Sequence, residues 1–266
     1  MCGIIIIIYH HFSMQTIHTV MSIVNLRVHI APVGFEIDRI AIPAKQMKAD
    51  RIWLLMHGEP TRDRAQGYME KIKTQLKKEK IDVHIEYSDR FDLFKILKSV
   101  REIVEKEQNN DIFINCSSGS KIQAIACMMA CMMFQGKTKL TPYYAEPESY
   151  SSVKGEQLSS GLKTVVKLPA YEIHTPKPAL VQALKIIKQH GGKITKKEMA
   201  RLAEEKKLIV VNAKEENFQQ ARFASLDKNI IQPLLNDWKF IEIERIGRTR
   251  WIRITSEGNG AVEFLN

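Results

Sequence analysis

The sequence predicts an α/β fold, a Rossmann-like parallel sheet covered by helices, followed by a C-terminal winged helix-turn-helix domain. Two observations lead to this prediction. Between residues 24 and 144, short apolar runs alternate with segments of helical length and period. After a proline-containing stretch, helix-like segments precede two alternating apolar and polar runs around Gly247. The 266 residues, 44% of them hydrophobic, suffice for two cores.

The N-terminal half is expected to alternate strands with helices. The strands are expected over Val24–Ala31, Arg51–His57, Ile81–Tyr87, Asp111–Cys116 and Lys139–Tyr144, with one more within Leu162–Leu168. The helices are expected over Phe35–Met47, Thr61–Lys80, Phe91–Gln108 and Ser120–Phe134, with Thr61 and Asp89 as N-caps. In an open sheet of this kind, ligands bind at the carboxyl ends of the strands.

Composition sets the expected domain boundaries. Residues 1–23 are expected to be a disordered extension without function, because the apolar run Ile4–Ile8 lacks the basic segment of a signal peptide. That run is also shorter than the ~20 residues of a membrane-spanning helix, so no membrane association is expected. Residues 24–168 should form the Rossmann-like domain, residues 169–177 the linker, with its prolines, and residues 178–266 the winged helix.

Cysteine spacing and net charge indicate the cellular location and the kind of partner to expect. The four cysteines lack paired C-x-x-C spacing, which favours a reducing, cytoplasmic location. Cys127 and Cys131 lie four residues apart on one helix face, a spacing open to a metal or redox pair, but buried apolar side chains are the simpler interpretation. No metal or cofactor is therefore expected. The net charge of +10 favours a polyanionic partner.

The segment from Asp111 to Lys121 places a strand, a Ser/Gly turn and a helix N-terminus in succession. The turn offers backbone N–H groups, the hydroxyls of Ser117, Ser118 and Ser120, and the Lys121 ammonium at the positive end of a helix dipole. This combination suits an anionic ligand such as a nucleotide. The simpler alternative is that Asn115 and Ser117 only cap the helix and that Lys121 is solvated.

His57 ends the second expected strand and Glu59 lies just after it, at the same edge of the sheet. The two side chains fit a proton-transfer pair, although a local hydrogen-bonding role for His57 is the simpler interpretation. No catalytic residue is therefore assigned, and the protein is not expected to be an enzyme.

The C-terminal part has the pattern of a winged helix-turn-helix. Helices are expected over Ala179–His190, from a Thr195–Glu198 capping box to Glu205, and over Glu216–Asp237. On the third helix, the residues expected to face the core are Phe218, Ala221, Ala224, Ile230, Ile231, Leu234 and Leu235. A hairpin over Lys239–Thr255 should place Ile241, Ile243, Ile252 and Ile254 on one face.

Double-stranded DNA is the expected partner of this domain. The third helix would present Gln219, Arg222, Ser225 and Lys228 to the major groove, and the hairpin would bring Arg245, Arg248 and Arg250 to the phosphates. The alternative is a winged helix used for protein contact or dimerisation.

A family resemblance rests on these residues. Asn115-x-Ser117-x-x-x-Lys121 resembles the [Asn/Asp]-x-[Ser/Thr]-x-x-x-[Arg/Lys] signature of CARF domains, the CRISPR-associated Rossmann fold, which follows the fourth strand. Joined to a winged helix, the chain resembles archaeal CARF-type transcriptional regulators from about Asn25 to Gly258. The stretch Pro32–Arg39 also resembles that subgroup.

The resemblance implies a homodimer whose sensing domains form one symmetric pocket, commonly for a cyclic oligoadenylate, and whose winged helices bind a palindromic operator. It implies that Asn115, Ser117 and Lys121 contact the ligand and that Ser118, Gly119 and Ser120 shape the loop. Val33, Gly34 and Phe35 would form the opposite wall, with Phe35 stacking on a base.

Three functions follow from the sequence. The leading one is a transcriptional regulator whose operator binding responds to a nucleotide. The second is a ring-nuclease-like enzyme that degrades cyclic oligoadenylate, for which the sequence shows no positioned general base. The third is a scaffold protein whose winged helix contacts another protein.

Overall fold

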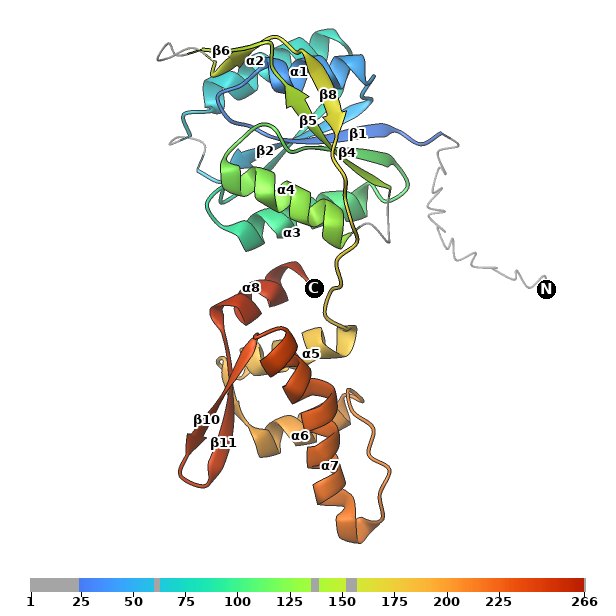
Figure 1. Cartoon of the computed structure of the whole chain (residues 1–266), viewed down its shortest axis with the longest axis vertical. Coiled ribbons are helices and arrows are strands. Elements are labelled where there is room, and N and C mark those ends of the chain that lie inside the picture. Colours follow the sequence, from blue (N-terminus) through green and yellow to red (C-terminus); the bar gives the residue numbers. More distant parts are fainter. Residues whose placement is uncertain (1–23, 60–62, 135–138, 152–156, 266) are drawn as a thin grey trace, which may run out of the picture.

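The computed structural model describes residues 24–59, 63–134, 139–151 and 157–265. The predicted extension over residues 1–23 and the predicted N-cap Thr61 lie outside these residues. Figure 1 shows an α/β domain and a smaller helical domain with a hairpin, joined by one extended segment. The predicted fold class, a Rossmann-like sheet followed by a winged helix, is confirmed.

The α/β domain is built on a six-stranded sheet in the order β3-β2-β1-β4-β5-β8. The strands are β1 Arg27–Pro32, β2 Arg51–His57, β3 Asp82–Ser88, β4 Asp111–Asn115, β5 Leu140–Glu146 and β8 Thr164–Lys167. The first five are parallel, and β8 is antiparallel to β5. A small hairpin of β6 Ser149–Tyr150 and β7 Ser159–Ser160 lies between β5 and β8 in the chain.

Helices cover both faces of this sheet (Figure 1). They are α1 Asp38–Gln46 and α2 Gln66–Lys78 on one face, and α3 Leu93–Lys106 and α4 Lys121–Met133 on the other. Each face has its own buried cluster, which is why the central strands are apolar runs rather than alternating ones. Cys127 and Cys131 are fully buried in the α3–α4 cluster, and burial raises the pKa of both thiols.

The predicted N-cap of α3 is wrong. The helix begins after Asp92, whose carboxylate accepts hydrogen bonds from the backbone N–H groups of Phe94 and Lys95. Asp89 instead accepts from the Phe91 N–H, in the turn before the helix. Both aspartates precede apolar residues, so the sequence pattern did not distinguish a turn from a cap.

The C-terminal domain has winged-helix topology. Its elements are α5 Pro178–Gln189, β9 Lys193–Thr195, α6 Lys196–Glu205, α7 Phe218–Leu226, β10 Ile241–Ile246, β11 Thr249–Ile254 and α8 Ser256–Phe264. A 3-10 turn, Glu215–Asn217, precedes α7, and wider helical turns over Asp227–Ile231 and Pro233–Asp237 continue it. The three strands form one antiparallel sheet in the order β10-β11-β9.

The side chains of this domain differ from the prediction at three points. Ala224 is exposed and Leu226 is buried, because the wider turns after Leu226 change the angle between successive side chains. Ile243 is 39% exposed, since β10 is an edge strand. Only half of the predicted capping box forms: Thr195 accepts from the Glu198 N–H, while the Glu198 carboxylate pairs with Arg201.

Helix α8 packs the winged helix against α3 of the α/β domain. The rings of Phe94 and Phe264 are stacked with centroids 5.8 Å apart. A Cβ on Gly260 would lie 2.2 Å from the Phe94 ring, so only glycine permits this approach. Arg101 of α3 donates to the Phe264 carbonyl at 2.7 Å, at the C-terminal end of α8. In the described part of the chain, no helix is long and apolar enough to cross a membrane.

A buried histidine in the central strand predicts acid sensitivity. His29 is fully buried between Phe113 and Tyr143, and burial lowers its pKa from 6.5 to about 4. Because the unfolded chain takes up the proton first, this group stabilises the fold fully above pH 6.5, and the contribution is lost as pH falls through about 4. The loss amounts to about 3 kcal/mol at most. We expect urea unfolding of His29→Phe to depend less on pH between 6.5 and 4 than unfolding of the wild type; equal slopes would contradict the assignment.

Candidate ligand and DNA sites

The loops after β1 and β4 meet at the switch point of the sheet. These two strands are neighbours, but the chain leaves them in opposite directions along the sheet, which is where open α/β sheets bind ligands. Gly119 has a φ of +78°, and a Cβ there would lie 2.4 Å from the Pro32 Cβ. A Cβ on Gly34 would lie 3.1 Å from the Gly119 Cα. The loop after β4 and the Val33–Phe35 stretch, which were predicted to be opposite walls of a ligand pocket, are therefore in direct contact.

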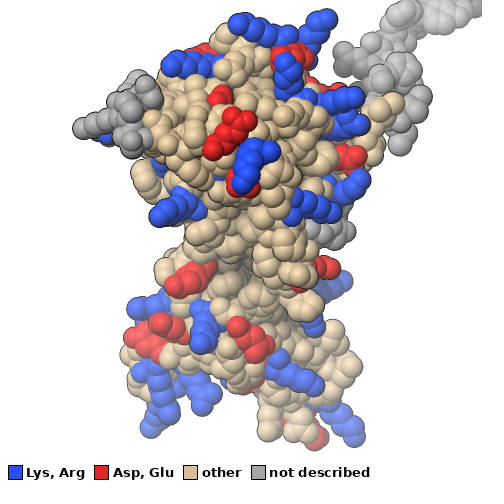
Figure 2. Space-filling view, turned by 45° about the horizontal axis from the view of Figure 1, so that its top comes forward, with Lys and Arg blue, Asp and Glu red and all other residues tan. Residues whose placement is uncertain are grey.

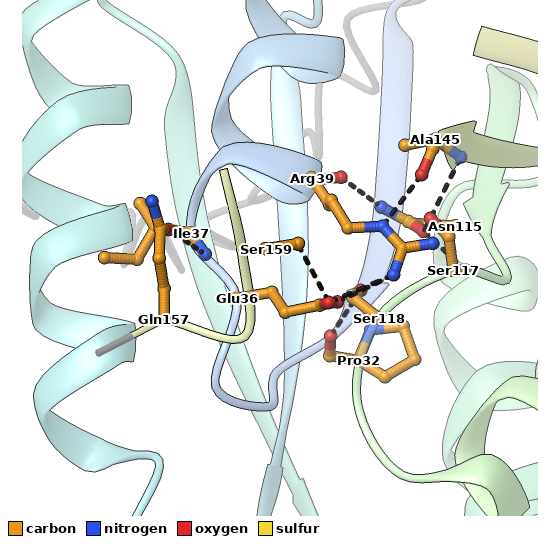
Figure 3. A network of polar contacts seen from close by, with 10 residues as sticks. All are labelled: Pro32, Glu36, Ile37, Arg39, Asn115, Ser117, Ser118, Ala145, Gln157 and Ser159. Atoms are coloured by element: carbon orange, nitrogen blue, oxygen red, sulfur yellow. Dashed lines mark hydrogen bonds and ion pairs between the residues drawn. The ribbon is translucent and has the colours of Figure 1, made fainter. Parts of the chain in front are cut away.

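Three predicted ligand residues hold this junction together (Figure 3). The Asn115 side chain, which is fully buried, donates to the Arg39 carbonyl at 2.9 Å and accepts from the Ser117 N–H and hydroxyl. The Ser117 hydroxyl also accepts from the Ala145 N–H. The Ser118 hydroxyl donates to the Pro32 carbonyl at 2.8 Å. Asn115, Ser117 and Ser118 thus set the shape of the loop through their own hydrogen bonds.

The first turn of α4 has unused donors. Ser120 and Gln123 form a capping box in which each side chain accepts from the other's backbone N–H. The backbone N–H groups of Lys121 and Ile122 have no acceptor among the described residues, as expected at a helix start. The Lys121 side chain is exposed and makes no ion pair with a described residue. An anion at this turn would meet two N–H groups, one ammonium and the helix dipole.

Arg39 is a central residue that the sequence analysis did not single out. Its side chain is 6% exposed; Nε donates to the Ala145 carbonyl at 2.8 Å, and Nη1 binds both oxygens of Glu36. The guanidinium also lies over the Tyr144 ring, 4.9 Å from its centroid. Its Nη2 has no hydrogen-bond partner within the described part of the chain. Figure 3 shows the guanidinium between Glu36 and the Asn115–Ser117 pair.

Gln157 and Ser159, which follow β6 in the chain, hold the segment at residues 36–38 by hydrogen bonds. Ser159 donates to Glu36 at 2.9 Å, and Gln157 bonds both the Ile37 N–H and the Asp38 carboxylate. These partners lie about 120 residues apart in sequence, so no local pattern could reveal them. The β1 loop is therefore held from both β4 and the β6–β7 hairpin.

A groove continues from this junction along the carboxyl ends of β2 and β3. It has a volume of about 510 Å³ and is lined by Phe35, His57, Glu59, Asp63, Arg64, Asp89, Arg90 and Phe91. Phe35 lies in it beside Tyr68, whereas Val33 is fully buried in the core. His57 accepts a hydrogen bond from the Arg90 N–H at 3.4 Å. This contact fits the local hydrogen-bonding role that was the simpler interpretation of His57 from the sequence.

The groove is joined to the β4 loop through Arg90. Its guanidinium pairs with the buried Asp63, and its carbonyl accepts from the Ser120 hydroxyl at 3.5 Å. The groove and the first turn of α4 thus form one continuous edge, which we call the switch edge: residues 33–36, 57–59, 63–64, 89–91 and 116–122. Cationic and aromatic side chains on this edge can bind phosphates and stack on bases.

The predicted DNA residues divide into two groups. Arg245, Arg248 and Arg250 are exposed on the wing, and Lys228 is exposed on the turn after α7. None of these four pairs with a described acidic residue. The two-residue turn Gly247–Arg248, with Gly247 at φ +60°, closes the hairpin as predicted.

On α7, Gln219 is exposed as predicted, whereas Arg222 and Ser225 are held by contacts within the domain. The Arg222 side chain is 13% exposed; Nη1 pairs with Glu204 of α6 at 3.0 Å, and Nη2 donates to the Gln219 side-chain oxygen. The Ser225 hydroxyl donates to the Val210 carbonyl at 2.9 Å. Arg222 and Ser225 therefore fix α7 against α6 and the loop before it.

Lys197 is a further exposed cation of the winged helix that the sequence prediction did not include. A groove of about 610 Å³ separates the start of α6 from the wing, and it is lined by Thr195, Lys196, Lys197, Phe223, Arg248, Thr249 and Arg250. Lys196 pairs with Asp227, but Lys197 is exposed without an ion-pair partner among the described residues. Figure 2 shows blue side chains gathered on this domain among fewer red ones. We call the residues that line this groove the basic end.

Fold and sites define a class: a Rossmann-like domain with a polar switch edge, followed by a winged helix with a basic end. Two family models match consecutive parts of the chain. Residues 27–150 match the family "HFX_2341_N:-like, N-terminal", and residues 179–266 match the DUF6293 C-terminal winged helix domain. The second match agrees with the winged helix that the sequence predicts and the structure shows.

A curated relative is "Uncharacterized protein MJ1513" of Methanocaldococcus jannaschii, 28% identical over 209 residues. The match covers 69% of this chain and spans 62% of the length of that relative.

Two solved structures resemble the chain distantly. They are Enterococcus italicus Csm6 bound to cyclic hexa-2'-fluoro-hexa-dAMP, at 12% identity and TM-score 0.41, and Can2 from Sulfobacillus thermosulfidooxidans in complex with cyclic tetra-adenylate, at 13% identity and TM-score 0.37. The matches cover 81% and 90% of this chain, and 56% and 63% of those chains. Such low TM-scores carry no functional argument.

Proposed function

We propose that this protein is a DNA-binding transcriptional regulator that acts as a homodimer and whose switch edge senses a nucleotide, with a cyclic oligoadenylate as the first candidate. The observation that carries the proposal is the pairing of two basic features in one chain. The first turn of α4 offers Lys121 and unpaired N–H groups to an anion, and the wing offers Arg248 and Arg250 to a polyanion.

The nucleotide class follows from the chemistry of the edge. A phosphate at the α4 turn would accept hydrogen bonds from the Lys121 and Ile122 N–H groups and from the Lys121 ammonium. A base could then stack in the neighbouring groove, where Phe35 and Phe91 contribute aromatic rings. Two copies of this edge in a dimer would suit a ligand with several phosphates and bases.

A continuous structural route joins this edge to the winged helix. Residues 89–91 line the groove and lead into α3, and α3 then packs on α8 through Phe94 and Arg101. A shift of the β3–α3 loop on ligand binding would therefore move α3 against the winged helix. In a dimer, that movement changes the distance between the two wings and so the affinity for a palindromic operator.

The test of ligand sensing is fluorescence anisotropy on DNA from the upstream region of its own gene, with and without cyclic tetra-adenylate. We expect Lys121→Ala to keep basal DNA affinity and to weaken the ligand response at least about tenfold, because it loses a charge-assisted hydrogen bond. Lys77→Ala, which removes an exposed lysine from α2, is the control and should respond as the wild type does. An undiminished response in Lys121→Ala would reject the assigned site.

The same assay tests the basic end. We expect Arg248→Ala and Arg250→Ala each to weaken DNA binding and to reduce the salt dependence of log K by about one unit, since each removes one phosphate contact. Arg222→Ala should act mainly through stability, because it leaves Glu204 without its partner. If both wing variants bound DNA as the wild type does, the wing would not be the DNA contact, and a winged helix used for protein contact would be favoured.

A further inference from the structure

A cavity lies between the two domains, away from both proposed sites. It has a volume of about 400 Å³, opens to solvent, and is lined by residues of α3, the end of α4, the linker, α5 and the end of α8. Cavities of this size at a domain interface, with mostly apolar walls and a few polar groups, are the usual form of small-molecule sites. The switch edge lies at the opposite, carboxyl end of the strands, so this cavity is a separate feature.

Both domains contribute apolar residues to the walls. Val104 and Phe134 come from the α/β domain, while Val181 and Phe264 come from the winged helix, and all four are at most 8% exposed. Val104, Phe134 and Phe264 belong to one buried cluster, so the cavity keeps its shape as long as α8 stays on α3. An apolar ligand body would bury surface against both domains at once.

The polar groups of the cavity carry a net positive charge. Arg101 pairs with Glu105 at 3.0 Å and donates to the Phe264 carbonyl, so its charge is balanced within the wall. Lys185 of α5 also lines the cavity, is half-buried and makes no ion pair with any described residue. A partly desolvated ammonium without a counter-charge favours an anion beside it.

We propose that this cavity binds a small amphipathic carboxylate, with its apolar body against Val104, Phe134, Val181 and Phe264 and its carboxylate on the Lys185 ammonium. Since both domains supply walls, the ligand stabilises the docked arrangement of the winged helix. The inference concerns binding only and holds whether or not the switch edge senses a nucleotide.

The experiment is isothermal titration of the full chain with octanoate and, as an uncharged probe with the same tail, octan-1-ol. We expect saturable binding of one octanoate per chain and at least about tenfold weaker binding of the alcohol. Lys185→Gln should weaken octanoate about tenfold and leave the alcohol unchanged, because it removes only the charged contact. Lys206→Gln, which removes an exposed lysine elsewhere on the winged helix, should bind as the wild type does.

A second variant tests whether the probes bind in this cavity. Gln182 is exposed at the rim of the cavity, so Gln182→Trp can block the opening without disturbing a core position, and it should abolish binding of both probes. Absence of saturable octanoate binding, equal affinity in Lys185→Gln, or unchanged binding in Gln182→Trp would each overturn the proposal. DNA and nucleotide binding measured on the same preparations test the regulator proposal independently.

Discussion

Arg39→Met is expected to destabilise the α/β domain by about 3–5 kcal/mol, because it leaves the Glu36 carboxylate buried without its counter-charge. Glu36 is only 7% exposed, and once Arg39 is gone its carboxylate keeps a hydrogen bond from the Ser159 hydroxyl alone among the described residues. Urea unfolding followed by circular dichroism measures the loss. The double variant Arg39→Met with Glu36→Gln should recover part of it, since a neutral amide is less costly to bury than a carboxylate.

The chain supplies a matched control for this change. Arg201 pairs with Glu198 at the same three-residue spacing as Arg39 with Glu36, but its side chain is 54% exposed. Solvent screens such a pair, so Arg201→Met should destabilise the protein far less than Arg39→Met does. Similar losses for Arg39→Met and Arg201→Met would show that the buried network does not hold the switch edge together.

Gly119→Ala is expected to displace the loop after β4 and to remove the ligand response together with stability. The left-handed backbone at φ +78° costs alanine about 1–2 kcal/mol. The added Cβ would also lie 2.4 Å from the Pro32 Cβ and 2.9 Å from the Gln123 side-chain oxygen. Relieving that overlap adds about 1–3 kcal/mol and pushes the loop away from β1.

Gly191→Ala separates the two contributions. Gly191 has almost the same φ, +75°, but a Cβ there would meet no atom within 4 Å. This variant should therefore show the backbone cost of about 1–2 kcal/mol alone and keep the nucleotide response of the wild type. If Gly119→Ala were no less stable than Gly191→Ala and responded normally, the close contact between the two loops would not matter for sensing.

The elements of the sheet could be predicted because the signal for each one is local. β2 was predicted with its observed bounds, Arg51–His57, since an apolar run flanked by polar residues leaves little choice of strand ends. The wing turn at Gly247 was equally clear, because a two-residue hairpin turn favours glycine at a positive φ. The sequence did not show correctly which side of the third winged-helix segment is buried, since the wider turns after Leu226 shift the buried face.

The polar residues of the site show where local patterns stop being informative. The segment from Asn115 to Lys121 marked the strand-turn-helix junction, yet nothing in it showed that the hydroxyls of Ser117 and Ser118 would bond to Ala145 and Pro32. Arg39 ends the Pro32–Arg39 stretch, but no local pattern showed its role, because its partners Tyr144 and Ala145 lie on a strand far along the chain.

By itself, the sequence determined the α/β sheet, the winged helix and the placing of Lys121 at the start of a helix, because apolar period, glycine turns and capping residues act over a few positions. Tertiary structure alone decided which polar groups remain available. It brought the Arg39 guanidinium to the Ala145 carbonyl and turned Arg222 toward Glu204. A side chain's partners depend on residues distant in sequence, so its freedom to bind a ligand or DNA is fixed only when the chain has folded.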